Sequence, residues 1–502
     1  MTRNFRNIPP RSGAMVEALR GLGYSTATAI ADIIDNSIAA NARKIEIIFN
    51  WAGATSSVFI IDDGVGMTDG ELEIAMSLGQ KNPLDERDVS DLGRFGMGLK
   101  TASFSQCRSL TVASQKNGVL SCLRWDLDTL STNKNGEWTL LEGPAEGSEH
   151  LLDNLPKETS GTIVIWENLD RLITPSFFEQ DFLDMIDRVE AHLGMVFHRF
   201  IEGATPKLSI NINGRPIKAW DPFLSKNPAT WSSPPIPIPS ESGIIKVQGF
   251  VLPHKDRLDP AVYENAGGPD GWTAQQGFYV YRNERLLVAG SWLGLGRSRS
   301  WTKEEAHRLA RIRLDIPNSA DAEWKINVIK STARPPVSIR NRLIRIAEDT
   351  RERARRVFAH RGQSVKSLGS VAIEEVWRAE HFKGGIRYKI DLTHPAVKNV
   401  LDEIIGTTSE ADFRAMLRVV EETIPVQRIW LDTAEAKETP RTGFADEGSA
   451  EIAEIAKVMY ENLVLKKGVS CALARAQLLR TEPFNNFPDL VNTLPEISIK
   501  SE

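Results

Sequence analysis

One short stretch constrains what this chain can fold into more than any other: A-I-A-D-I-I-D-N-S-I-A-A-N-A, residues 29–42. Its isoleucines recur at helical spacing, which predicts an amphipathic helix. At about 100° per residue, Asp32 and Asn36 fall together on the face opposite the isoleucines, where residues four apart are neighbours. Small alanines flank the pair and would leave room for a ligand. A solvated helix face is the alternative when this segment is taken alone.

A glycine-containing motif follows this helix. Two apolar, β-branched strands are predicted at 44–50 and 56–61, and the second ends in D-D-G-V-G-M, residues 62–67. Glycines at this spacing allow the backbone to approach a flat ligand closely, and the carboxylate of Asp62 can accept a hydrogen bond. A calcium loop is a rival interpretation, but the other oxygen ligands and the terminal glutamate of such a loop are missing. An ordinary glycine turn stays open for this motif alone.

A second glycine motif is G-R-F-G-M-G-L-K-T-A-S, residues 93–103, which comes after a polar segment. Three glycines leading into a helical pattern are typical of a loop whose amide groups face phosphate oxygens. Lys100 would add a point charge there. The spacing fits neither a dinucleotide fingerprint nor a Walker loop, and a purely structural loop is the alternative. Further on, S-G-T-I-V-I-W at 160–166 predicts a buried strand with Thr162 at its start.

These pieces occur in a fixed order: D-x-x-x-N (Asp32, Asn36), D-x-G-x-G (Asp62, Gly64, Gly66), G-x-x-G-x-G-x-K (Gly93, Gly96, Gly98, Lys100) and G-T (Gly161, Thr162). Together they resemble the GHKL ATPases, which include DNA gyrase, the large heat-shock chaperone, histidine kinases and MutL. They are most similar to the MORC and bacterial MutL-like branch. The resemblance implies an α+β architecture with a Bergerat-type ATPase domain, in which helices cover one face of a mixed β-sheet. It also implies that the ligands are ATP and Mg²⁺.

The resemblance assigns roles to single residues. Asn36 would bind Mg²⁺ through its amide oxygen, and Asp62 would accept a hydrogen bond from the adenine amino group. The remaining nucleotide-binding residues that it implies are Gly64, Gly66, Met67 and Thr162 near the base, and Gly93, Gly96, Met97, Gly98, Leu99, Lys100 and Thr101 around the phosphates.

Asp32 is a departure from the family pattern, because hydrolysing members carry a glutamate there to orient and deprotonate the attacking water. Aspartate is shorter by one C–C bond, about 1.5 Å, and a general base must come within roughly 2.6–3.2 Å of its proton. Position 39, often acidic in the family, is Ala39. Either the helix lies closer to the γ-phosphate, or an extra water intervenes, or hydrolysis is slow. The resemblance therefore supports ATP binding more firmly than turnover, and a binding switch that hydrolyses little is an alternative.

An α/β transducer domain is predicted at 204–362, after the ATPase domain at 1–203. Its predicted strands lie at 207–214, 243–253 and 277–287, and a proline-rich loop is predicted at 225–240. The segment Y-R-N-E-R-L-L and the tract 310–331 resemble the transducer of MutL and MORC. There a loop lysine reaches the γ-phosphate of ATP. Lys330 matches that lysine and is assigned a catalytic role, with Lys325 as the second choice.

The transducer region is the basic part of a chain whose net charge is −5. Residues 340–361 hold eight arginines and three acidic residues. A solvated helix with ion pairs is one interpretation, and sequence-independent, salt-sensitive contact with DNA phosphates is the other. The arginines predicted to contact DNA are Arg297, Arg299, Arg340, Arg342, Arg345, Arg353, Arg355 and Arg356.

A mainly helical third region is predicted at 363–502, with helices at 409–424 and 449–466 and a flexible connection at 432–448. No catalytic constellation stands out in it, so dimerisation or docking of a protein partner is the default interpretation. The three cysteines show neither zinc-site nor disulfide spacing. No signal peptide or apolar run long enough to span a membrane is evident, which predicts a cytoplasmic protein.

Three functions remain open at this point. The first is an ATP-dependent dimeric clamp of MORC or MutL type that acts on DNA, in a restriction or phage-defence module as the resemblance implies. The second is a chaperone-like ATPase that remodels proteins, and the third is an ATP-binding switch with little hydrolysis.

Overall fold

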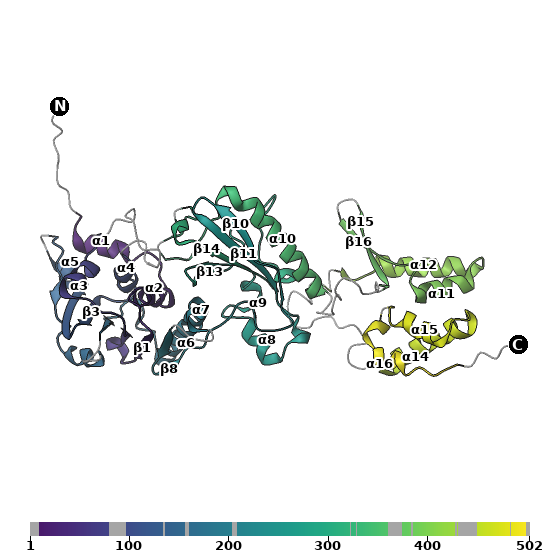
Figure 1. The fold of residues 1–502 in the computed structure, drawn as a ribbon, viewed down its shortest axis with the longest axis horizontal. Coiled ribbons are helices and arrows are strands. Elements are labelled where there is room, and N and C mark those ends of the chain that lie inside the picture. The colour runs from purple at the N-terminus through teal and green to yellow at the C-terminus, as the bar shows by residue number, and fades with distance from the viewer. Residues whose placement is uncertain are drawn as a thin grey trace, which may run out of the picture. The chain divides into compact units, whose positions relative to one another are not determined.

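The computed structural model describes residues 10–79, 97–133, 136–155, 160–202, 208–321, 323–327, 329–359, 374–382, 385–426, 429, 449–481 and 483–497. The chain divides into two compact units, Met1–Gln363 and Ser364–Glu502. Two β-sheets lie in the first unit, and a pair of strands with several helices forms the second (Figure 1).

The first sheet has eight strands in the order β5-β4-β3-β6-β2-β1-β7-β8, and it is mixed because β1 and β7 are parallel. Its strands are β1 (Lys44–Asn50), β2 (Ser57–Asp62), β3 (Ser109–Lys116), β4 (Val119–Asp126), β5 (Leu141–Glu142), β6 (Gly161–Glu167), β7 (Ser209–Ile212) and β8 (Arg215–Pro216). The strands predicted at 44–50, 56–61 and 160–166 are confirmed to within one residue. The sheet continues through β8, past residue 203.

Helices of the N-terminal part pack on this sheet and form one large apolar core with it. They are α1 (Ser12–Leu19), α2 (Thr26–Ala39), α3 (Asp69–Met76), α4 (Gly98–Phe104), α5 (Leu127–Thr132), α6 (Glu179–Val196) and α7 (His198–Ile201). The other face of β2, β3 and β6 carries a smaller cluster, which packs against the 3₁₀ turn Glu149–Asn154. A mixed sheet with its main helical layer on one face is the predicted α+β architecture.

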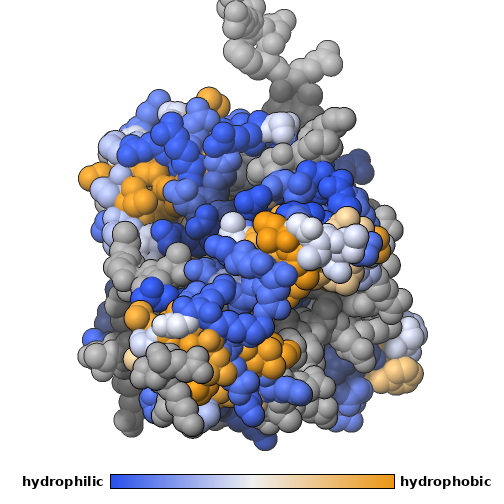
Figure 2. Space-filling view, turned by 90° about the vertical axis from the view of Figure 1, so that its right-hand side faces the viewer, coloured by the Kyte–Doolittle hydropathy of each residue, from blue (hydrophilic) through white to orange (hydrophobic). Residues whose placement is uncertain are grey.

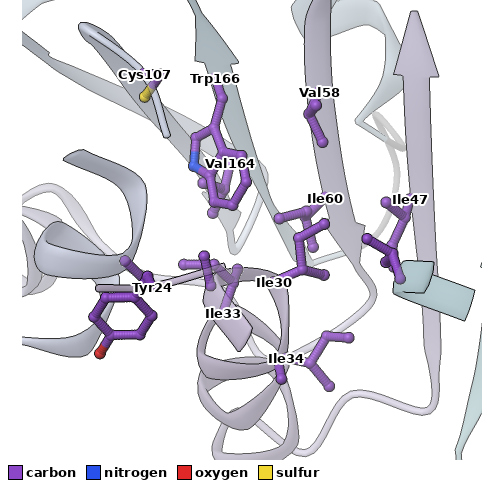
Figure 3. Close-up of a cluster of buried hydrophobic side chains, with 14 of the residues drawn as sticks. Tyr24, Ile30, Ile33, Ile34, Ile47, Val58, Ile60, Cys107, Val164 and Trp166 are labelled. Carbon is purple, nitrogen blue, oxygen red and sulfur yellow. The ribbon is translucent and has the colours of Figure 1, made fainter. Parts of the chain in front are cut away.

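Helix α2 begins at a capping box. The hydroxyl of Ser25 accepts a hydrogen bond from the amide of Thr28, whose own hydroxyl accepts one from the Ser25 amide. Such a box satisfies donors that a helix N-terminus otherwise leaves without partners. Ile30, Ile33 and Ile34 of α2 belong to the same buried cluster as Ile47 of β1 and Ile60 of β2 (Figure 3). Each fully buried isoleucine stabilises the fold by roughly 1.5–3 kcal/mol, so the predicted apolar stripe anchors the helix.

The opposite side of α2 differs from a solvated helix face. Asn36 is exposed, as an amphipathic helix predicts. Asp32, however, is only 4% exposed. The reason is that the second half of the first unit covers this part of α2, so the alternative of a solvated face is wrong for Asp32.

The second sheet has six strands, five of them in the order β10-β11-β14-β12-β13, with β9 also paired to β11. They are β9 (Trp231–Ser232), β10 (Ile236–Ser240), β11 (Gly243–Val251), β12 (Gly277–Arg282), β13 (Arg285–Ser291) and β14 (Ala310–Ile316). Helix α10 (Val337–Ala359) packs its apolar stripe on one face of this sheet. Two short helices, α8 (Pro260–Ala266) and α9 (Gly271–Ala274), lie between β11 and β12 in the chain.

The loop predicted at 225–240 is wrong in its last part, because β10 is a strand. Pro237 and Pro239 are exposed, whereas Ile238 between them is fully buried. An edge strand has one partner only, so it tolerates prolines, which cannot donate a backbone hydrogen bond. These prolines therefore lie in a strand at the edge of the sheet.

The second unit is mainly helical, as predicted, and also contains an antiparallel pair of strands. Its elements are β15 (Trp377–Phe382), β16 (Gly385–Ile390), α11 (Pro395–Ile404), α12 (Thr408–Glu422), α14 (Ser449–Glu461), a π-helical turn (Asn462–Lys466), α15 (Cys471–Leu478) and α16 (Pro488–Asn492). The connection predicted at 432–448 lies outside the described residues. Among the helices described, none is long and apolar enough to cross a bilayer. Figure 2 shows hydrophobic side chains in separate patches among hydrophilic ones on one face of the molecule.

Candidate functional site

A buried carboxylate ends the central strand β2. Asp62 is 8% exposed, and it accepts hydrogen bonds from the Ser37 hydroxyl at 2.7 Å and from the Gly64 amide at 2.9 Å. Burial raises the pKa of Asp62 above its ordinary value, although these two hydrogen bonds oppose the shift. The carboxylate is thus held in one orientation, as recognition of a planar ligand requires.

The two predicted glycines next to Asp62 are needed for steric reasons. Gly66 has a φ of +67°, and a Cβ atom there would lie 2.0 Å from the carbonyl oxygen of Gln115. A Cβ atom at Gly64 would lie 2.9 Å from the Cβ atom of Ala40. Only glycine fits the backbone conformation and the space at position 66. The close approach of backbone segments beside Asp62 therefore explains the glycines of the D-x-G-x-G pattern.

Met67 and Thr162 lie at the same place through a shared partner. The Ser114 hydroxyl accepts a hydrogen bond from the Met67 amide at 2.8 Å and lies 2.9 Å from the Thr162 hydroxyl. Thr162 pairs with Asp62 across β6 and β2. The structure thus brings together the residues predicted to surround the base, and Ser114 is an additional member that the sequence did not reveal.

The second glycine motif meets α2 at the start of α4. A Cβ atom built at Gly98 would lie 3.7 Å from Oδ2 of Asp32, so the first turn of α4 is next to that carboxylate. Met97 precedes this turn, Leu99 lies within it, and the Thr101 hydroxyl donates to the Met97 carbonyl at 3.0 Å. Gly93 and Gly96 lie outside the described residues.

Lys100 of α4 makes a contact with α3. Its ammonium is buried and donates a 2.8 Å hydrogen bond to the carbonyl oxygen of Ala75 in α3. Contact of Lys100 with a phosphate stays a prediction.

The strongest electrostatic feature joins α2 to the second half of the first unit. The Lys330 ammonium lies 3.0 Å from Oδ1 of Asp32 and 2.5 Å from Oδ2 of Asp35. The Nε atom of Arg285 lies 3.1 Å from both carboxylate oxygens of Asp35. Nη2 of Arg285 is 3.6 Å from Oδ1 of Asp32. We call these four buried side chains the carboxylate–lysine cluster.

Tyr24 completes the surroundings of Asp32. Its hydroxyl donates a 2.8 Å hydrogen bond to Oδ2 of Asp32, and burial together with this carboxylate raises the pKa of Tyr24 far above its ordinary value. Both oxygens of Asp32 are therefore engaged, one by Lys330 and one by Tyr24.

The structure brings the predicted Asp32 and Lys330 together, whereas Lys325, the second choice, is exposed. Sequence reasoning missed Asp35 and Arg285. A usable signal for Asp35 was its spacing, because a residue three after Asp32 shares its helix face. For Arg285 the signal was weaker, since it only opens the strand after a tight turn.

Burial alone would raise the pKa of Asp35, but the adjacent Arg285 and Lys330 cations hold it below its ordinary value. Asp35 is thus ionised at neutral pH. The cluster consists of two carboxylates and two cations. Because their charges compensate one another, burying all four costs less free energy than burying an unpaired charge.

The family of this region follows from its similarity to known proteins. A sequence model of the family described as histidine kinase-, DNA gyrase B-, and HSP90-like ATPase matches residues 24–162. That range contains α2, the glycines beside Asp62 and the first residues of β6. This part of the chain is a GHKL ATPase domain.

The GHKL domain also has relatives among curated proteins. The DNA mismatch repair proteins MutL of Rickettsia akari and Rickettsia felis are each 36% identical to this chain over 93 residues. MutL of Rickettsia rickettsii is 34% identical over 91 residues. Each match covers 18% of this chain and 15% of the relative. The chain is therefore MutL-like over a short part of the length of these relatives.

Asn36 fits the predicted magnesium ligand by its chemistry and position. Its amide is exposed on α2, one turn after Asp32. No group of three or more acidic, histidine or cysteine side chains among the described residues could hold a metal ion by itself.

Proposed function

We propose that the GHKL domain binds Mg·ATP along α2 and hydrolyses it slowly. The observation that carries this proposal is that α2 connects two groups of residues, one suited to the adenine and one suited to the phosphates. At one end lie the buried carboxylate of Asp62, which suits the adenine amino group, and the turn at Gly66 beside it. At the other lie Asp32 and Lys330 beside the first turn of α4. Mg²⁺ held by Asn36 would neutralise charge on the phosphates.

Each residue of the second end has a distinct task in this proposal. Asp32 orients the attacking water and accepts its proton, while Tyr24 fixes the carboxylate plane. Lys330 turns to the γ-phosphate and neutralises charge that develops on it. The amides at the start of α4 face the phosphates, as helix N-termini do. Hydrolysis is slow because Asp32 is short and must first give up a cation.

Three variants test the nucleotide site. Asn36→Ala should weaken ATP binding in the presence of Mg²⁺, and unchanged affinity would remove the assignment of this helix. Turnover should drop strongly in Asp32→Asn, while Asp32→Glu should match or exceed the wild type because its carboxylate reaches further. Equal rates for wild type and both variants would show that Asp32 is not the base.

A binding switch with little hydrolysis is the second candidate. The observation that favours it is that both oxygens of Asp32 are already engaged. A wild-type rate equal to that of Asp32→Asn, together with normal ATP affinity, would support the switch over the ATPase.

We further propose that the chain acts as a dimeric clamp on DNA, in a repair or defence setting. Two facts support DNA as the partner: the similarity to proteins named for DNA mismatch repair, and the exposed arginines of α10. Of the eight arginines predicted to contact DNA, Arg297 pairs with Glu348, Arg356 pairs with Glu352, and Arg353 lies over the ring of Trp231. The interpretation of α10 as a helix with ion pairs is thus correct for a minority of these arginines.

The clamp proposal is tested by measuring ATP turnover and oligomeric state with and without DNA. ATP should convert monomers to dimers, and DNA should raise turnover at low salt. If the protein stays monomeric with a non-hydrolysable ATP analogue, or if DNA binding is absent at low salt, the clamp is rejected.

A further inference from the structure

Asp35 has no task in the proposed chemistry, and yet it is the most deeply buried carboxylate of the cluster. It is 1% exposed, and it lies one helical turn from Asp32 on the side of α2 that faces the transducer. An ionised group is not buried so completely unless cations compensate it. Its two partners, Arg285 and Lys330, both come from the second half of the first unit.

The two cations are held to different degrees. Arg285 is fixed from two sides, since its Nε atom contacts both oxygens of Asp35 and its Nη1 atom donates a 2.8 Å hydrogen bond to the Leu286 carbonyl. Within the described part of the chain, the Lys330 ammonium donates hydrogen bonds to the two carboxylates only. Its backbone has a φ of +51°, so the residue lies in a tight turn and carries its ammonium on a flexible side chain. Lys330 is therefore the member that can leave.

If Lys330 leaves the cluster, Asp32 and Asp35 do not keep the same partners. Asp35 keeps a direct partner in Arg285. Asp32 keeps the Tyr24 hydroxyl and only a distant guanidinium nitrogen, 3.6 Å away. A carboxylate is a better proton acceptor once an adjacent cation has gone. Movement of the Lys330 ammonium would therefore make Asp32 a better proton acceptor, while Asp35 would stay bound to Arg285.

We propose that Asp35 and Arg285 are positioning residues that set the γ-phosphate response of Lys330: Asp35 competes with the γ-phosphate for the ammonium, and Arg285 weakens this competition by neutralising Asp35. The proposal rests on the ATP site proposed above. It predicts that the two residues act in opposite directions. Without the charge of Asp35, Lys330 transfers more easily to ATP; without Arg285, Asp35 holds Lys330 more tightly.

The test compares the affinity for a non-hydrolysable ATP analogue with the affinity for ADP, by titration calorimetry. Only the analogue carries a γ-phosphate, so the ratio of the two affinities reports the Lys330 contact and cancels general damage to the site. Asp35→Asn should raise this ratio about tenfold, and Arg285→Met should lower it about tenfold, within the usual range of coupling between sites. Lys330→Met should bring it close to one.

A matched control is available in another ion pair between the same two parts of the unit. Arg199 of α7 pairs with Asp315 of β14, and neither residue contacts the cluster. Asp315→Asn should leave the affinity ratio unchanged. Arg285→Lys keeps the charge but loses the second point of attachment, so its ratio should lie between those of the wild type and Arg285→Met. This variant keeps the test valid if Asp35→Asn does not fold.

The outcomes separate the two proposals. If the wild type binds the analogue and ADP equally, Lys330 does not sense the γ-phosphate and the proposed ATP chemistry fails at that point. If the wild type prefers the analogue and Lys330→Met loses the preference, that chemistry stands. In that case, unchanged ratios in the Asp35 and Arg285 variants, or shifts of both in the same direction, overturn the positioning role.

Discussion

The hydroxyl of Tyr24 donates a 2.8 Å hydrogen bond to Oδ2 of Asp32. Tyr24 immediately precedes Ser25, the residue that caps α2. The start of the helix is therefore tied to the side chain that carries the proposed chemistry. Because Lys330 holds the other oxygen of Asp32, this carboxylate has almost no rotational freedom.

Tyr24→Phe removes this hydrogen bond and keeps the ring that packs in the core. We expect the free energy of unfolding to fall by about 1.5–3 kcal/mol, the usual net value of a hydrogen bond to a charged group, as measured by urea denaturation. Turnover should fall about tenfold, because a base that is free to rotate loses its alignment. ATP affinity should not change. If turnover is unaffected, Tyr24 has only a structural role.

The fold was predictable where one local pattern decides the outcome. The isoleucine spacing predicted α2, and apolar, β-branched runs predicted β1, β2 and β6 to within one residue. The edge strand β10 was missed because prolines usually signal loops, although an edge strand tolerates them.

The site was predictable only in part, for a physical reason. The motifs around Asp62 and Asn36 are local, so a family resemblance could locate them. The carboxylate–lysine cluster joins Asp35 to Arg285, 250 positions later, and to Lys330, 295 positions later. Only the packing of the second half of the first unit against α2 creates these contacts. Spacing along the chain carries no information about them.

Gly66→Ala should disrupt the adenine end of the site. The new methyl group would collide with the carbonyl oxygen of Gln115, and the residue would keep an unfavourable positive φ. We expect a loss of about 3 kcal/mol or more in stability, from backbone strain of roughly 1–2 kcal/mol plus overpacking of roughly 1–3 kcal/mol. Any folded fraction should bind ATP weakly.

Gly118→Ala is the matched control for this variant. Gly118 has a φ of +77° in the turn between β3 and β4, with no atom within 4 Å of the added methyl group. It should show the backbone strain alone and retain normal ATP affinity. Equal losses in the two variants would contradict a steric role for Gly66. Thermal unfolding and nucleotide titration measure both effects.

The raised pKa of Asp62 predicts acid sensitivity of ATP binding. Adenine recognition needs an ionised acceptor, so affinity should fall as the pH drops through this raised pKa. The stability of the fold should depend on pH in the opposite direction to ATP affinity. Since the folded protein binds this proton more readily than the unfolded chain, the contribution of Asp62 to stability decreases as the pH rises through the same interval.

Asp62→Asn provides the control, because an amide does not titrate. Its ATP affinity should be about 10- to 100-fold lower than that of the wild type at neutral pH, the effect of losing a charged hydrogen-bond acceptor of roughly 1.5–3 kcal/mol. The affinity should also be independent of pH in the acidic range. If wild type and variant show the same pH profile, Asp62 does not contact the base.

The first half of α10 should provide the salt-sensitive contact with DNA. Arg340, Arg342 and Arg345 are exposed, and within the described part of the chain none of them forms an ion pair. Their replacement by glutamine should weaken DNA binding and reduce the slope of log affinity against log salt by about 0.9 for each phosphate that is no longer neutralised. Replacing Arg297 and Arg356, which pair with Glu348 and Glu352, should have a smaller effect. A salt slope that stays unchanged in the first variant would exclude this half of α10 from the DNA interface.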